Sequence, residues 1–125
     1  MLKTRFSALT GAAVLVMAVA FSPAVLAHAH LKSQYPAANA NVEASPQALT
    51  LTFSEDIEPA FSRVEIIGSG QQTMPTAEVE RAPKQHNQLI VPLEKPLPGG
   101  SYQVNWHVLS VDGHKTKGSY TFSVK

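Results

Sequence analysis

Residues 102–108 read Tyr-Gln-Val-Asn-Trp-His-Val, and this stretch decides the fold class. Large apolar side chains occupy every second position, with polar side chains between them. Such alternation is typical of a β-strand that is buried on one face only. The turn residues Pro98-Gly99-Gly100 come just before it. Tyr102 can therefore turn its hydroxyl back onto the preceding loop, as in a tyrosine corner, or simply pack in the core.

The same alternation recurs on both sides of this stretch. Leu49 to Phe53 and Val64 to Ile66 each show it, and Tyr120 to Val124 closes the chain in the same way. Leu89 to Leu93 is a short apolar run, which predicts a buried strand. Pro92 interrupts this run and predicts that the strand lies at an edge or carries a bulge.

Turn signals separate these segments. The chain holds nine prolines and seven glycines, and most of the prolines fall between the alternating runs. In the polar stretch 71–88, which holds Met74, a short strand is expected around Ala77 to Glu80. About seven short strands joined by turns predict an all-β protein, a sandwich of the immunoglobulin-like kind.

The N-terminal stretch differs in composition from the rest of the chain. A short basic start is followed by the uncharged apolar run Ala8 to Phe21 and by small residues up to Ala27. This order is typical of a secretory signal peptide, and the apolar run is short for a membrane span. We therefore expect residues 1–27 to be a signal peptide removed on export and residues 28–125 to be one domain.

Two cleavage sites fit the small residues that a signal peptidase reads. Val25-Leu26-Ala27 places the cut before His28, which we prefer, whereas Ala27-His28-Ala29 places it before His30. The choice decides which histidine carries the free α-amine.

Charge and cysteine content exclude several classes of function. The leader holds two of the ten basic residues and none of the nine acidic ones, so the remaining net charge is −1 with histidines neutral. A mixed, nearly neutral surface argues against nucleic-acid binding. The chain has no cysteine, which excludes disulfides and thiolate metal sites. The domain must therefore fold on its apolar core alone.

His28 becomes a chelating residue if it starts the mature chain. It then offers an α-amine and an imidazole, whose usual pKa values are near ~8 and ~6.5, so both deprotonate at mild pH. Asp112 and His114 lie two positions apart and point to one side in an extended segment, and Gly113 lets the loop bend around a common centre. Three nitrogens and one oxygen suit Cu(II) or Ni(II), and the divalent order favours copper. Asp112-Gly113 is also a common hairpin turn without any metal.

His28-Ala29-His30 allows a second mode of binding. An N-terminal X-X-His tripeptide binds Cu(II) through its amine, two deprotonated amides and the third imidazole, in the flat geometry that Cu(II) favours. This mode needs no folded protein and uses the same amine. We favour the folded chelate, because Asp112 and His114 otherwise have no role.

Other polar residues have simpler interpretations. His107 lies on the polar face of its strand, and His86 lies in a polar loop, so both are expected at the surface. Trp106 is expected in the core. Glu55 and Asp56 follow a strand and are expected to be solvated acids.

Four parts of the chain resemble the CopC family of periplasmic copper-binding proteins. In chain order they are His28–Leu31 with Tyr35–Ala37, Leu51–Glu55, Leu97–Trp106, and Ser110–His114 with Gly118–Val124. The resemblance implies a seven-stranded Greek-key sandwich or barrel, a periplasmic location and one Cu(II) ion per chain.

The resemblance also implies the ligands. They would be the amine and ring of His28, the carboxylate of Asp112 and the ring of His114, with Glu55 beside the amine as a supporting residue. One branch of the family carries a methionine-rich loop for Cu(I). Here Met74 is the only methionine after the leader, and one thioether does not make the soft site that Cu(I) prefers. We therefore expect a member specific for Cu(II).

The expected function is a copper carrier or buffer for copper homeostasis or resistance. We expect a monomer without enzymatic activity, acting beside an inner-membrane copper transport protein of the CopD type. One alternative is a brace-type copper oxidase or monooxygenase, but Asp112 would fill the position that oxygen needs. The other alternative is a structural or adhesion module that binds no metal.

Overall fold

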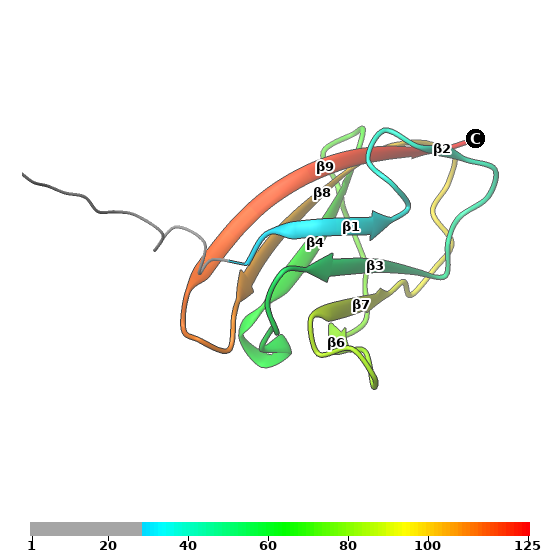
Figure 1. The fold of residues 1–125 in the computed structure, drawn as a ribbon. Coiled ribbons are helices and arrows are strands. Elements are labelled where there is room, and N and C mark those ends of the chain that lie inside the picture. The colour runs from blue at the N-terminus through cyan, green and yellow to red at the C-terminus, as the bar shows by residue number, and fades with distance from the viewer. Residues whose placement is uncertain (1–28) are drawn as a thin grey trace, which may run out of the picture.

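The alternating segments form two β-sheets that pack face to face in the computed structural model, which describes residues 29–125 (Figure 1). One sheet has the strand order β1-β3-β7-β6, and the other has the order β2-β9-β8-β4-β5. The strands are β1 Leu31–Tyr35, β2 Asn41–Val42, β3 Ala48–Phe53, β4 Arg63–Gly68, β5 Thr73–Met74, β6 Glu80–Arg81, β7 Gln88–Pro92, β8 Gly100–Leu109 and β9 Lys115–Val124. A short 3-10 helix, η2, spans Pro59–Phe61. No helix in this part of the chain is long and apolar enough to cross a membrane.

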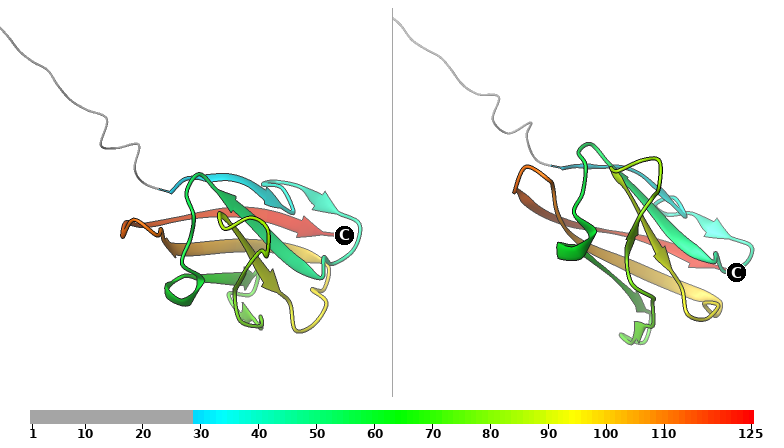
Figure 2. Two further views of the ribbon diagram at one scale, coloured as in Figure 1. Left: turned by 60° about the horizontal axis from the view of Figure 1, so that its bottom comes forward. Right: turned by 90° about the horizontal axis from the view of Figure 1, so that it is seen from below.

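The centre of the larger sheet is the long hairpin of β8 and β9. The two strands pair without a break from Gly100 opposite Val124 to Leu109 opposite Lys115. On its other edge β8 pairs with β4, from Arg63 opposite His107 to Gly68 opposite Tyr102. The two further views in Figure 2 show β8 and β9 side by side along the sandwich. The expected all-β sandwich is therefore confirmed.

The core is made by the residues that the alternation pattern placed inward. Tyr102, Val104, Trp106 and Val108 of β8 are all buried, and Leu49, Leu51 and Phe53 of β3 face them with no exposed surface. The rings of Phe53 and Trp106 meet edge to face across the two sheets, with centroids 5.2 Å apart. The expected core position of Trp106 is confirmed.

Gly118 of β9 makes room for the indole of Trp106, its partner on β8. A Cβ atom at position 118 would lie 2.4 Å from the nearest atom of the Trp106 ring. Real Cβ atoms essentially never come this close to another heavy atom. A side chain at this position would therefore displace the indole.

Tyr102 forms the tyrosine corner. Its hydroxyl donates a hydrogen bond to the carbonyl of Pro98, four residues earlier. The ring also stacks on Phe122, with centroids 5.7 Å apart. The hydroxyl thus fastens the loop that enters β8, as one of the two interpretations of the sequence predicted.

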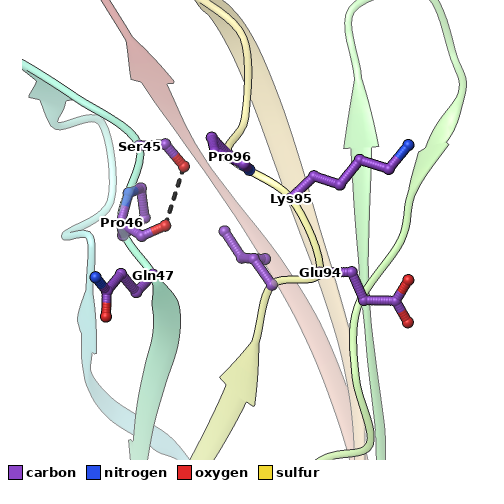
Figure 3. Close-up of a pocket in the computed structure, with 7 residues that line it drawn as sticks. Ser45, Pro46, Gln47, Glu94, Lys95 and Pro96 are labelled. Carbon is purple, nitrogen blue, oxygen red and sulfur yellow. Dashed lines mark hydrogen bonds between the residues drawn. The ribbon is translucent and has the colours of Figure 1, made fainter.

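A shallow hollow of about 490 Å³ lies near this corner, between the segments that precede β3 and follow β7 (Figure 3). Ser45 lies in its lining, and the Ser45 hydroxyl accepts a hydrogen bond from the backbone N–H of Leu97 at 2.8 Å. The hollow is formed by loops at the end of the sandwich remote from the β8–β9 turn.

The strand around Pro92 differs from the expectation. β7 is an inner strand between β3 and β6, and its register is regular, so it is neither an edge strand nor bulged. Pro92 is its last residue, and the Pro92 carbonyl accepts from the N–H of Ala77 at 2.8 Å. In a strand the N and O atoms of one residue face the same side, and β6 does not extend that far. The missing N–H of Pro92 therefore interrupts no ladder.

The stretch 71–88 contains two short strands instead of one. β5 pairs Met74 with Ile66 of β4, and β6 pairs Glu80 with Ile90 of β7. The expected strand around Ala77 to Glu80 overlaps β6 at Glu80 only. Both strands have two residues, too few for an alternation pattern to reveal.

Candidate metal centre

The turn between β8 and β9 is closed by its own backbone. The N–H of Ser110 donates to the carbonyl of His114 at 3.0 Å, and the N–H of Gly113 donates to the carbonyl of Ser110 at 2.9 Å. Gly113 has a φ of +94°, which residues with a side chain rarely adopt. The glycine therefore permits the bend that brings its two neighbours together.

Asp112 and His114 lie in contact at this turn. The Asp112 Oδ1 atom is 3.2 Å from His114 Nδ1, and it also accepts from the His114 backbone N–H at 3.4 Å. The side chains are 36% and 45% exposed, respectively, so both can be reached from solvent. The turn thus presents one carboxylate and one imidazole side by side.

Ser110 supports this pair from the interior of the protein. Its side chain is buried, and its hydroxyl donates to Asp112 Oδ1, the same oxygen that contacts His114. This hydrogen bond is the main reason why the pKa of Asp112 lies below its usual value. Burial opposes the lowering, and the contacts with His114 add to it. The carboxylate therefore stays charged and available as a donor. The sequence did not single out Ser110, because a serine in a turn carries no sign of its own that it is buried.

The start of the described chain is fastened at the same end of the sandwich. Ala29 is 1% exposed and belongs to the core. The N–H of His30 donates to the hydroxyl of Ser54 at 2.8 Å, and the carbonyl of His30 accepts from the N–H of Ser54 at 2.8 Å. The residue after His28 is therefore held firmly. His28 itself, the expected signal peptide and both cleavage sites up to His28 lie outside the described residues.

The segment after β3 joins the start of the chain to the turn. Ile57 forms an isolated bridge with Ser110, and the N–H of Val111 donates to the carbonyl of Asp56 at 3.0 Å. Figures 1 and 2 show the start of β1 and the β8–β9 turn at one end of the molecule. Ala29 and the Asp112–His114 pair are thus brought to the same end through residues 54–57.

The remaining candidates are placed less decisively. The side chain of Glu55 is half-buried and makes no hydrogen bond or ion pair with another residue of the described range. His30 and His86 are exposed, and Asp56 is exposed as expected for a solvated acid. His107 lies on the outer face of its strand but is half-buried, so it is less exposed than expected.

Within residues 29–125 no group of three or more His, Asp or Glu side chains lies close enough to hold a metal ion. Asp112 and His114 are therefore an incomplete set of ligands by themselves. Met74 is half-buried on β5 and packs against the core.

The CopC domain matches the chain over residues 31–125, which is nearly the whole sandwich. The chain belongs to the CopC family. It is 57% identical over 104 residues to protein YobA of Escherichia coli K12, a match that covers 83% of this chain and 84% of YobA. The resemblance to the CopC family is therefore confirmed, and within the family this chain is similar to the YobA-like members.

Solved CopC structures share the fold. The crystal structure of CopC from Methylosinus trichosporium OB3b superposes with a TM-score of 0.73 at 33% identity, covering 78% of this chain and 94% of that chain. PcoC from Escherichia coli, described as a methionine-rich copper resistance protein, gives a TM-score of 0.69 at 34% identity, covering 78% of this chain and 99% of that chain. This CopC protein differs from PcoC in keeping a single methionine after residue 27.

Proposed function

We propose that this CopC protein is a periplasmic Cu(II) carrier or buffer that serves copper homeostasis or resistance. The observation that carries the proposal is the Asp112–His114 pair, preformed at an exposed turn beside the start of the domain. A copper resistance protein of the same fold supports copper as the cargo. It also supports a carrier rather than an enzyme. We further propose that the chain is a monomer and exchanges copper with an inner-membrane protein of the CopD type.

We propose His28 as the residue that completes the site. Removal of residues 1–27 would give His28 a free amine beside its imidazole, and its neighbour Ala29 is anchored in the core at this end of the sandwich. With Asp112 and His114 the set has three nitrogens and one oxygen, which suits one Cu(II) ion. Glu55, in the segment that joins the two halves of the site, would support the amine.

The packing around Ala29 and His30 disfavours the tripeptide mode. That mode needs the backbone nitrogens of both residues as copper ligands. The His30 N–H donates to Ser54, and Ala29 is almost fully buried. Copper would have to break this hydrogen bond and draw Ala29 out of the core, whereas the folded chelate leaves both in place.

The proposal predicts the mass of the exported protein. Native mass spectrometry of protein purified from the periplasm should give a chain that begins at His28 and gains one copper ion. A chain that begins at His30 would move the amine and exclude the proposed ligand set. A chain that begins at His28 but binds no Cu(II) would favour the metal-free structural module, and peroxide production by the copper form would favour the oxidase.

A further inference from the structure

Basic side chains form a row across the outer face of the larger sheet, next to the β8–β9 turn. His107 of β8 is paired with Arg63 of β4 on one side and with Lys117 of β9 on the other. Residues directly opposite each other on neighbouring strands hold their Cβ atoms about 5 Å apart on one face. Lys115 lies on the same face of β9, two residues before Lys117. Three strands thus place four basic residues together.

No acid balances this row within the described part of the chain. The contacts between acidic and basic side chains there are His114–Asp112 and Lys125–Glu43, and neither involves Arg63, Lys115 or Lys117. Glu65 is the acid of β4 on the same face, and its partner across the ladder is Asn105, one row away from His107. Arg63, Lys115 and Lys117 therefore present positive charge that no acidic side chain of the described residues pairs with.

The row lines a hollow with an apolar rim. A pocket of about 480 Å³ is bordered by Arg63, His107, Lys115, Lys117 and the ring of Phe61. Phe61, at the end of η2, is 74% exposed, the highest value among the exposed large apolar residues of the described range. The buried Nδ1 atom of His107 has no hydrogen-bond partner in that range. Exposed aromatic surface bordered by charge is typical of an interaction site.

We propose that this face is a docking surface for an acidic segment of a partner protein. Carboxylates of the partner would lie against Arg63 and Lys117, and an apolar side chain would cover Phe61. Charge complementarity of this kind speeds association and fixes orientation, and it weakens as salt is added. A buried apolar contact on Phe61 would add affinity that salt does not remove.

The position of the surface suggests its use. His107 and Lys115 belong to β8 and β9, the two strands joined by the turn that carries Asp112 and His114. A partner docked here would therefore lie beside these two residues. Use of this surface in copper exchange rests on the proposed function. The docking itself does not, because it involves none of the proposed ligands.

The test is an NMR titration of the copper-free, ¹⁵N-labelled mature chain with a synthetic peptide, acetyl-Glu-Glu-Leu-Glu-Glu-amide, at low salt. Amide shifts should concentrate around Phe61 to Glu65, Asn105 to Leu109 and Lys115 to Ser119. The same peptide with Gln for Glu should bind at least about tenfold more weakly. Phe61→Ser should weaken binding without changing its salt dependence.

Two double variants separate this surface from general attraction. Arg63→Glu with Lys117→Glu should lose at least about tenfold in affinity, whereas Lys84→Glu with Lys95→Glu, exposed lysines elsewhere, should lose less than about twofold. Arg63→Gln with Lys117→Gln should keep the fold and also lose binding, and its melting temperature should match or exceed that of the parent.

Three results would overturn the proposal. Equal losses in both double variants would show non-specific attraction to a basic chain. Shifts centred away from Phe61 and His107 would place the peptide elsewhere. Vesicles of phosphatidylglycerol that bind through Arg63 and Lys117, when the peptide does not, would make this face a site for anionic lipid instead.

Discussion

The Oδ1 atom of Asp112 lies 3.2 Å from Nδ1 of His114, and the buried hydroxyl of Ser110 donates to the same carboxylate oxygen. The pair is held by the backbone of a closed turn and by a serine fixed in the core. Ligands that the fold orders in advance lose less conformational freedom on binding, so more of the interaction energy remains as affinity. Ser110 is therefore the buried residue that would orient the proposed ligands Asp112 and His114.

Ser110→Ala should therefore weaken Cu(II) binding without removing a ligand. Loss of the supporting hydrogen bond should raise the pKa of Asp112 towards its usual value, because that hydrogen bond is the main cause of the lowered pKa. Loss of such a supporting contact typically lowers metal affinity about 10- to 100-fold. Carboxyl NMR of the copper-free variant would give the pKa, and competition with a Cu(II) chelator would give the affinity. Ser119→Ala, at an exposed position of β9, is the matched control. An unchanged pKa with unchanged affinity would contradict this role of Ser110.

Tyr102 and Tyr120 should respond differently to loss of their hydroxyls. The Tyr102 hydroxyl bonds Pro98, so Tyr102→Phe should cost about 1 kcal/mol in the free energy of unfolding. The Tyr120 hydroxyl is buried without a hydrogen-bond partner in the described range, so Tyr120→Phe should be neutral or stabilising at pH 7. Urea unfolding of both variants checks this pair.

Burial also raises the pKa of the Tyr120 phenol above its usual value of 10. A raised folded-state pKa means that the stability from this group is complete below pH 10. It decreases as the pH rises from there through the folded-state pKa, since the unfolded chain ionises first. Tyr120→Phe should flatten the alkaline fall in melting temperature. An equal fall in the variant would contradict this effect of burial.

Gly118→Ala should destabilise the sandwich, because the new Cβ would lie 2.4 Å from an atom of the Trp106 indole. Overpacking of this kind costs about 1–3 kcal/mol. Trp106 is the only tryptophan of the chain, so its fluorescence spectrum reports the displaced ring directly. A parental spectrum and parental stability in this variant would show that the indole can move aside freely.

Met74→Leu should leave Cu(II) affinity unchanged and cost less than about 1.5 kcal/mol, because the substitution conserves volume at a half-buried position of β5. Cu(I) affinity should be weak in both proteins, since one thioether makes a poor soft site. Titration with a Cu(I) indicator measures this. A tight Cu(I) complex that the substitution abolishes would contradict specificity for Cu(II).

Much of the fold could be predicted, because strands buried on one face show their alternation in the sequence. The pattern of 102–108 is the example, with every inward residue buried. β1 could not be found in this way, since Leu31 to Tyr35 alternates neither in sequence nor in burial. β9 begins at Lys115, five residues before the expected Tyr120. The alternation pattern did not reveal this first half of the strand, because one of its inward positions is Gly118, which lies against Trp106.

The candidate site could be predicted only where residue types and their spacing in the sequence indicate metal binding. Asp112, Gly113 and His114 carried a recognisable spacing, and the structure brings the two side chains into contact. Ser110 depends on burial, and the row of Arg63, His107 and Lys117 depends on the register of three strands. Neither property can be read from one short segment.

The most direct test of the central claim is Cu(II) affinity in three single variants of the mature chain, measured by competition with a chelator and by paramagnetic resonance. His114→Ala and Asp112→Asn should each weaken binding at least about 10- to 100-fold, and the copper spectrum of His114→Ala should show more amide nitrogens as the tripeptide mode takes over. His30→Ala should cost much less, because its ring takes no part in the folded chelate. Loss of tight binding in His30→Ala, together with the parental affinity and spectrum in His114→Ala, would contradict the proposed ligand set.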